Sequence, residues 1–112
     1  MNYGKTFQNI QNEFNDFFDN IDFYLDNDSE YYSKSFELQS KLSLLIKEIY
    51  RSSESNSNKN LIEEILSFWG DFVGTGEDYE ISGKILDNLL EQGFISEPQL
   101  RIFYNNLSTR QG

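Results

Sequence analysis

Carboxylates recur along one face of the first predicted helix. Their spacings of three, three, three and four residues place them on one side of a helix: Glu13, Asp16, Asp19, Asp22 and Asp26. From Glu13 to Glu30 the chain has seven acidic residues and no Lys or Arg. Solvated helices usually alternate acids with Lys, because each such pair adds about 0.2–0.5 kcal/mol. This acidic ridge therefore indicates a surface for a basic partner, or else the solvated face of a generally acidic protein.

Phe23 lies among these acids on the helical wheel, away from the apolar stripe. A large aromatic side chain exposed within a charged surface is typical of an interface anchor. The alternative is that a neighbouring helix covers the ring. The two possibilities differ in whether Phe23 is exposed.

A second acidic cluster surrounds the Gly-Thr-Gly turn at 74–76, and its members are Asp71, Glu77, Asp78 and Glu80. Asp78 and Glu80 are expected in the first turn of a helix, where a carboxylate gains about 0.3–1 kcal/mol from the helix dipole. Stabilisation of the helix start would account for these two acids. The alternative is that the cluster forms a second contact patch with Tyr79 as its anchor.

The composition excludes most catalytic chemistry. The chain has no Cys and no His, so disulfides, cysteine nucleophiles, Cys/His zinc sites and imidazole bases are absent. Exposed acids on a small helical bundle also lack the desolvated pocket that a glycosidase-type acid needs. We therefore expect no enzyme and no cofactor.

A metal site is not expected either, although four acids have the spacing of a calcium-binding loop: Asp26, Asp28, Glu30 and Glu37. Tyr31 stands where that loop needs Gly for its sharp turn. The glycines around residue 74 likewise lack the Lys-Ser/Thr of a phosphate-binding loop.

Charge limits the possible partners. The 112 residues carry 19 acids and 9 bases, a net charge of −10 at pH 7. Such a field repels nucleic acid and anionic lipid and attracts basic proteins. The N-terminus lacks the apolar core of a signal peptide, and no stretch of 18 apolar residues occurs, so we expect a cytoplasmic protein without a membrane anchor.

Apolar residues at steps of three and four predict an all-α fold, a single domain over 1–112 with about five helices. The first should run over about 6–26 and the second to about Arg51, and their short turn predicts an antiparallel hairpin. A flexible polar loop is expected over about 52–59 and a frayed tail over about 108–112. The predicted core stripe of the first helix is Phe7, Ile10, Phe14, Phe17, Phe18, Ile21 and Leu25.

Several residues should begin, end or join these helices. Thr6 is a candidate N-cap, and Asn60 begins a capping-box-like stretch that would start the third helix. Gly93 should end the fourth helix in the left-handed conformation, and Ser96 with Gln99 forms a capping box for the fifth. Gly83, costly inside a helix, predicts a close helix crossing.

One stretch resembles the acidic helix-turn-helix of small immunity proteins that protect bacteria from polymorphic toxins, including Maf-type and contact-dependent nuclease toxins. The resemblance rests on GEDYEI at 76–81 and ILDNLLEQGFIS at 85–96. It implies a cytoplasmic protein that binds a cognate toxin domain and blocks its active site or substrate groove. It assigns no catalytic residue.

These observations together predict a non-catalytic inhibitor that binds a basic, nucleic-acid-acting protein, with carboxylates placed where phosphates would lie. The first choice is an immunity protein. A phage-encoded anti-defence protein, mimicking DNA against a restriction or CRISPR effector, uses the same physics. A helical adaptor that self-associates through its aromatic residues is the alternative of another class. We expect the free protein to be a monomer or a weak dimer.

Overall fold

The computed structural model describes residues 2–52, 56–73 and 77–111, with side chains for all of these except 25, 28, 56–58, 77–78 and 108–111. Within these ranges all regular structure is helical, which confirms the predicted all-α fold. The helices are α1 (Tyr3–Asp19), α2 (Ile21–Leu25), α3 (Asp28–Arg51), α4 (Asn56–Phe72), α5 (Glu77–Glu91) and α6 (Glu97–Gln111). None of these helices has the length and apolar character needed to cross a membrane.

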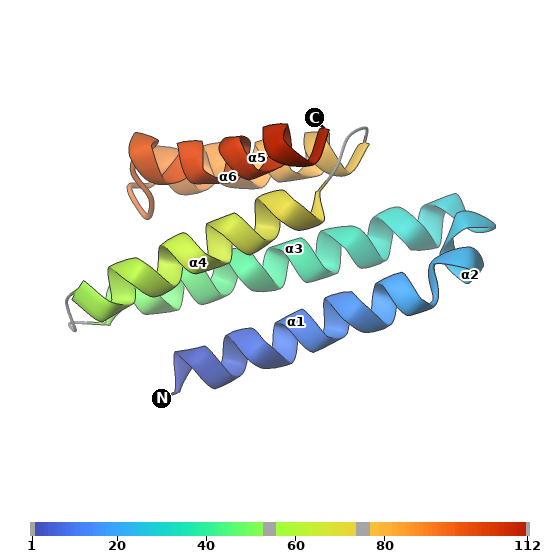
Figure 1. Cartoon of the computed structure of the whole chain (residues 1–112), viewed down its shortest axis with the longest axis horizontal. Coiled ribbons are helices and arrows are strands. Elements are labelled where there is room, and N and C mark those ends of the chain that lie inside the picture. The colour runs from blue at the N-terminus through green and yellow to red at the C-terminus, as the bar shows by residue number, and fades with distance from the viewer. Residues whose placement is uncertain (1, 53–55, 74–76, 112) are drawn as a thin grey trace.

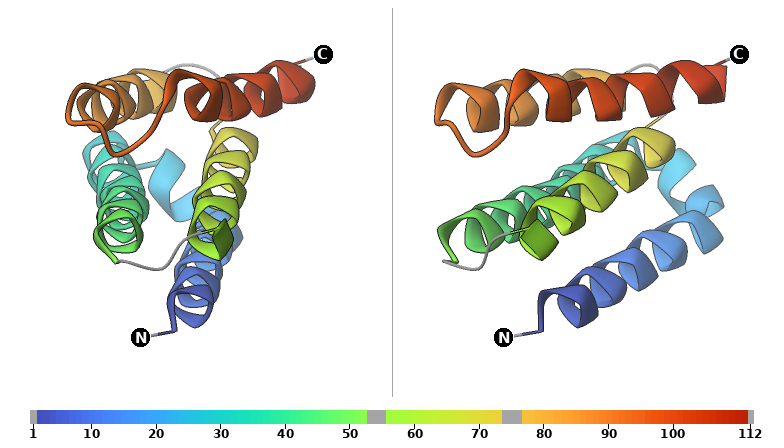
Figure 2. Two further views of the ribbon diagram at one scale, coloured as in Figure 1. Left: turned by 90° about the vertical axis from the view of Figure 1, so that its left-hand side faces the viewer. Right: turned by 60° about the vertical axis from the view of Figure 1, so that its left-hand side comes forward.

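The helices form three layers (Figures 1 and 2). One layer holds α1, the middle layer holds α3 and α4, and the third holds α5 and α6, with the short α2 between α1 and α3 at one end of the molecule. α1 and α3 run antiparallel, as the predicted hairpin requires, whereas α3 and α5 run in the same direction. The middle layer is covered on both sides, so most of the core lies around α3 and α4.

The first predicted helix is interrupted at Asn20. Its backbone leaves the helical conformation (φ −109°, ψ 23°), and its side-chain amide donates to the Asp16 carbonyl oxygen at 2.8 Å. Asn favours such positions because its side chain competes for backbone hydrogen bonds. The single helix predicted over 6–26 is therefore wrong, and two helices, α1 and α2, replace it.

Helix starts also differ from the prediction at two places. α1 begins three residues before Thr6, because Asn2 is the N-cap and accepts a hydrogen bond from the Lys5 backbone N–H at 3.0 Å. α4 begins at Asn56, so Asn60 lies inside the helix, and the predicted loop over 52–59 is shorter. Residues 53–55 lie outside the described residues. α6 continues past the expected end at Leu107 to Gln111.

The connection from α5 to α6 follows the prediction. Gly93 has φ 83°. Its N–H donates to the Leu90 carbonyl at 3.1 Å, and the Phe94 N–H donates to the Leu89 carbonyl at 2.9 Å. These two bonds form a Schellman motif, in which Gly is favoured because it lacks a Cβ. The capping box is also present, since the Ser96 N–H donates to Gln99 Oε1 at 2.9 Å.

The core is aromatic where α1 meets α4. The ring of Phe14 lies edge-on to Phe68 at 5.2 Å and to Phe72 at 4.3 Å. Four residues of the predicted stripe on α1 are buried: Phe7, Ile10, Phe14 and Phe17. Phe18, predicted to belong to this stripe, is 42% exposed, and its ring lies 4.9 Å from that of Phe72. The stripe is therefore narrower than the sequence predicts.

The close helix crossing lies at Gly70 and not at Gly83. A Cβ added to Gly70 would collide with the backbone carbonyl oxygen of Phe103, so α4 and α6 approach each other there without an intervening side chain. A Cβ added to Gly83 meets nothing within 4 Å. The prediction of a crossing at Gly83 is therefore wrong, because periodicity along one helix does not reveal which glycine faces another helix.

A buried amide joins three helices. Gln39 of α3 is fully buried, and its Oε1 accepts hydrogen bonds from Trp69 Nε1–H of α4 at 2.8 Å and from the Ser82 hydroxyl of α5. Its Nε2 donates to Ser35 Oγ at 2.9 Å. Buried polar groups are tolerated when they are paired in this way.

We expect opposite effects from the same substitution at two glycines. Gly70→Ala should lower the free energy of unfolding by about 1–3 kcal/mol, because a backbone carbonyl cannot move aside easily. Gly83→Ala should raise it by about 0.5–1 kcal/mol, since Ala costs less than Gly inside a helix. Urea denaturation of both variants measures the difference. Equal stability of the two would contradict the assigned crossing.

Gln39→Leu should destabilise the fold although it places an apolar residue in the core. The Trp69 N–H would lose its acceptor, and a buried unsatisfied donor costs about 1–3 kcal/mol. The control is Gln8→Leu on the exposed face of α1, which should change stability by less than about 0.5 kcal/mol. Thermal or urea unfolding distinguishes them, and a Gln39→Leu variant as stable as the control would show that the amide is dispensable.

Candidate functional site

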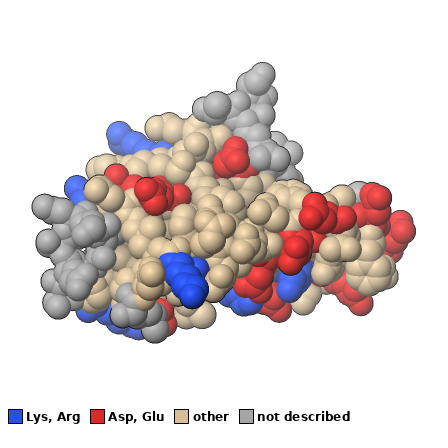
Figure 3. Space-filling model, turned by 60° about the horizontal axis from the view of Figure 1, so that its bottom comes forward, with Lys and Arg blue, Asp and Glu red and all other residues tan. Residues whose placement is uncertain are grey.

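Exposed carboxylates gather at one end of the molecule. The end of α1, the short α2, the start of α3, the end of α4 and the start of α5 all lie there (Figure 1), and acidic side chains cluster at this end in Figure 3. We call this surface the acidic end. Its exposed acids are Asp16, Asp19, Asp22, Asp26, Glu30, Asp71 and Glu80.

The fold brings the two predicted acidic clusters to this same end. The ring of Phe18 at the end of α1 lies 4.9 Å from that of Phe72 at the end of α4. Asp71, next to Phe72 in the chain, is therefore carried toward the acids of α1 and α2. The two clusters are separate in the sequence, and only the packing of α1 against α4 joins them.

Glu13 differs from the rest of the ridge. Its Oε1 lies 2.6 Å from Lys41 Nζ of α3, and each side chain is 39% exposed. The ion pair joins α1 to α3 within the hairpin. Glu13 thus already has a cationic partner inside the protein, whereas Asp16 and Asp19 are fully on the exposed side of α1.

The interruption at Asn20 changes the shape of the ridge. Asp16 and Asp19 lie in the last turn of α1, Asp22 lies in α2, and Asp26 is the C-cap of α2. A single helical wheel does not describe these positions beyond Asp19. The carboxylates consequently spread around the end of the molecule instead of forming one straight row.

Phe23 is exposed, which decides between the two alternatives for its placement. Its side chain is 56% exposed, and its ring packs edge-on to Tyr24 at 5.2 Å. Tyr24 in turn lies 4.8 Å from the buried Phe17, so the exposed ring rests on the core. With Phe18, two partly exposed phenylalanines lie among the carboxylates. The sequence pattern assigned Phe18 to the core stripe, and its exposure of 42% shows that this assignment was wrong.

The second cluster is described in part. Asp71 and Glu80 are exposed, and Tyr79 is 40% exposed with its ring 6.3 Å from that of Tyr104. Burial raises the pKa of Tyr104, and the neighbouring Tyr79 and Asp87 raise it further. α5 begins at Glu77, so Asp78 and Glu80 belong to its first turn, as the sequence predicts. The side chains of 77 and 78 lie outside the described residues.

Two cationic side chains of α3 are bound to carboxylates that are not among the exposed acids of the acidic end. Lys41 is bound to Glu13, and Lys34 is bound to Glu37 at 2.8 Å. The Lys34–Glu37 hydrogen bond raises the pKa of Lys34 and lowers that of Glu37. Lys84 of α5 lines a hollow together with Glu80 of the acidic end.

The start of α1, the end of α3 and the starts of α4 and α6 lie at the opposite end of the molecule (Figure 1). These segments contain five cationic residues: Lys5, Lys47, Arg51, Lys59 and Arg101. Charge is thus unevenly distributed along an axis of 44 Å.

This arrangement is suited to binding. The described residues contain no group of three or more acids placed to hold a metal ion. No protein-family model, curated protein or solved structure matches this chain. The interpretation of the acidic end therefore rests on its own geometry, in which exposed carboxylates surround two partly exposed aromatic rings.

Two phenylalanines six residues apart should respond differently to truncation. Phe17→Ala should lower the free energy of unfolding by about 3–5 kcal/mol, because this side chain is only 2% exposed. Phe23→Ala should change it by less than about 0.5 kcal/mol, since the ring is largely in solvent. Urea denaturation measures both values. A large loss in Phe23→Ala would show that the ring stabilises the fold and is not a free surface anchor.

Proposed function

We propose that this protein is a non-catalytic inhibitor that binds a basic, nucleic-acid-acting protein through the acidic end. One observation carries the proposal: exposed Asp19 and Asp22 directly follow or precede Phe18 and Phe23 in the chain, and these two phenylalanines are 42% and 56% exposed. Acids at i, i+3 spacing destabilise a helix by mutual repulsion. Their clustering with exposed aromatic rings is therefore better explained by a partner than by stability.

The physical basis is competition with phosphate. A protein that cleaves or grips nucleic acid needs a cationic groove, and carboxylates fixed on helices can occupy it without ordering cost at binding. Electrostatic attraction speeds association, whereas burial of Phe18 and Phe23 against the partner would slow dissociation. The two kinds of side chain thus supply different parts of the affinity.

Within this proposal the partner is a cognate toxin domain and the protein its cytoplasmic immunity protein. The resemblance noted for 76–96 supports this choice, and that segment covers α5 and the turn to α6. The start of α5 contributes Tyr79 and Glu80 beside the acidic end. If the captured partner is a restriction or CRISPR effector and not a toxin, the protein is an anti-defence protein that uses the same surface.

Charge reversal at the acidic end should abolish binding and leave the fold intact. Asp16→Lys with Asp19→Lys converts two attractive groups into repulsive ones, and relief of repulsion should keep α1 at least as stable. The wild-type protein is used to capture partners from its host at low salt. The association rates of the wild type and of the variant with the captured protein are then measured. The wild-type rate should fall about tenfold or more as ionic strength rises.

The matched control is Glu64→Lys with Glu91→Lys, which makes the same charge change at exposed positions of α4 and α5 outside the acidic end. This variant should bind nearly as well as the wild type. Equal binding by the Asp16/Asp19 variant would remove the acidic end as the site. A captured protein that is not basic, or whose nucleic-acid cleavage the wild type does not inhibit, would overturn the proposed function.

A further inference from the structure

One face of α3 is left without a partner helix. α3 packs against α1, α2, α4 and α5 on its other sides. Residues at steps of three and four form the outward face, which we call the α3 stripe: Ser29, Ser33, Phe36, Ser40, Leu44, Lys47 and Arg51. Phe36 is 55% exposed and Leu44 is 59% exposed. Exposed apolar residues grouped on one helix face mark an interaction surface.

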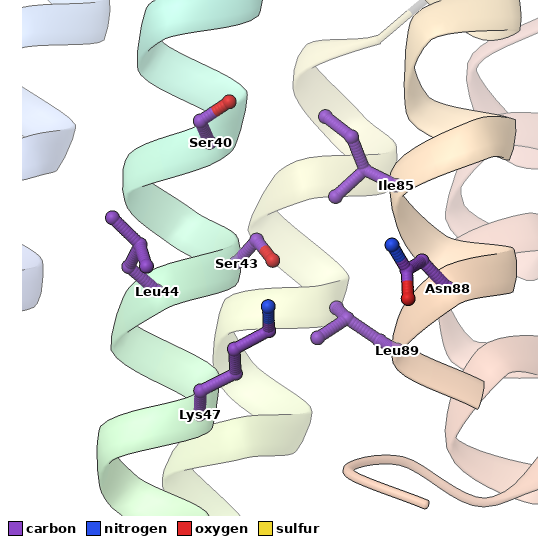
Figure 4. Close-up of a pocket in the computed structure, with 7 residues that line it drawn as sticks. All are labelled: Ser40, Ser43, Leu44, Lys47, Ile85, Asn88 and Leu89. Atoms are coloured by element: carbon purple, nitrogen blue, oxygen red, sulfur yellow. The ribbon is translucent and has the colours of Figure 1, made fainter. Parts of the chain in front are cut away.

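The stripe continues into a groove between α3 and α5. Near the start of both helices a hollow of about 470 Å³ is lined by Tyr32, Phe36, Glu80, Ile81, Lys84 and Ile85. A second hollow of about 260 Å³ follows, and Figure 4 shows Ser43 and Lys47 of α3 beside Ile85, Asn88 and Leu89 of α5. Both hollows share Ile85, so the apolar surface extends across two helices.

The stripe also differs from the rest of the surface in charge. The chain has 19 acidic residues, yet none of the seven stripe residues is acidic. Its basic residues, Lys47 and Arg51, lie at the C-terminal end of α3, whereas Glu30 lies near its N-terminal end, next to Ser29. Glu37 and Glu48 flank the stripe on α3 and Glu80 lines the first hollow, but the stripe itself presents only apolar, small and basic side chains to a second copy.

We propose that the α3 stripe binds a second copy of this chain, with the two α3 helices antiparallel about a two-fold axis at Ser40. Phe36 and Leu44 each lie four residues from Ser40, so Phe36 of one copy meets Leu44 of the other. The small Ser40 side chain at the axis permits close approach of the helices. Closed two-fold dimers are the commonest assemblies, and such an interface must be complementary to itself.

Charge selects the antiparallel arrangement. Lys47 and Ser33 each lie seven residues from Ser40, and Arg51 and Ser29 each lie eleven residues away. Each cation therefore faces a serine of the second copy, and Arg51 approaches the Glu30 side of that copy. A parallel pairing would place Lys47 against Lys47 and Arg51 against Arg51, and like charges opposed across an interface are unfavourable.

This dimer goes beyond the proposed inhibitor function. Asp16, Asp19 and Asp22 lie on α1 and α2, outside the stripe, so these acids of the two copies remain free and point in opposite directions, whereas Glu30 lies beside the interface. The dimer would then offer two binding ends to partners. The Asp16→Lys, Asp19→Lys variant should still dimerise, which separates the two proposals experimentally.

The absence of cysteine allows a direct test at the two-fold axis. Ser40→Cys introduces a single thiol, and two such thiols should lie close together in the dimer. Treatment with a short bifunctional thiol reagent should cross-link Ser40→Cys at least about tenfold faster than Asn9→Cys, the control on the exposed face of α1. Similar rates for the two variants would overturn the proposal.

Analytical ultracentrifugation provides an independent measurement. The wild type should show a concentration-dependent shift to twice the monomer mass. Phe36→Ser with Leu44→Ser should stay monomeric, and its unfolding midpoint should equal that of the wild type at concentrations where the wild type is also monomeric, because both side chains are exposed in the monomer. A wild type that remains monomeric at millimolar concentration, or a dimer that the double variant leaves intact, would show that the α3 stripe does not bind a second copy.

Discussion

The amide of Gln39 is the interaction on which the arrangement of the helices depends. One oxygen accepts hydrogen bonds from Trp69 of α4 and Ser82 of α5, so α3 cannot rotate or slide against either helix without leaving a buried donor unpaired. Apolar packing is non-directional and tolerates alternative registers. A hydrogen-bonded polar group in the core is directional, so it favours one relative position of the helices. Here the side chain of Gln39 does this for α3, α4 and α5.

The register set by Gln39 also determines which helix ends come together. α3 begins at the end of the molecule where α4 finishes and α5 starts, and the hairpin brings the end of α1 to the same place. The carboxylates of Asp19 and Glu80 are remote in sequence, yet both belong to the acidic end. Repulsion among such groups opposes folding, so the core must supply stabilisation that offsets it. No described buried side-chain polar atom lacks a hydrogen-bond partner, so the stabilisation from the core is not reduced by unpaired polar groups.

The features that the sequence predicted correctly are local ones. Gly93 and the pair of Ser96 with Gln99 act through bonds to residues at most five positions away, so their types and spacing suffice to identify them. The antiparallel direction of α1 and α3 follows from two periodic stripes, although α2 (Ile21–Leu25) takes the place of the short turn that the sequence predicted. The interruption at Asn20, the exposure of Phe18 and the crossing at Gly70 depend on what lies opposite each residue in space. Periodicity along one helix carries no information about the helix that packs on it, and the Gln39 network was missed for the same reason.

The same distinction explains the two surfaces. The acidic ridge was visible in the sequence because a run of like charge is a local property, although the membership of Glu13 was altered by its tertiary ion pair with Lys41. The α3 stripe was not predicted, since the exposure of Phe36 and Leu44 follows only from the positions of α1, α4 and α5. The helices packed on α3 leave one of its faces uncovered, and that face carries Phe36, Leu44 and two cations. The acidic end instead combines carboxylates with the exposed rings of Phe18 and Phe23, so the two surfaces differ mainly in the sign of their charge.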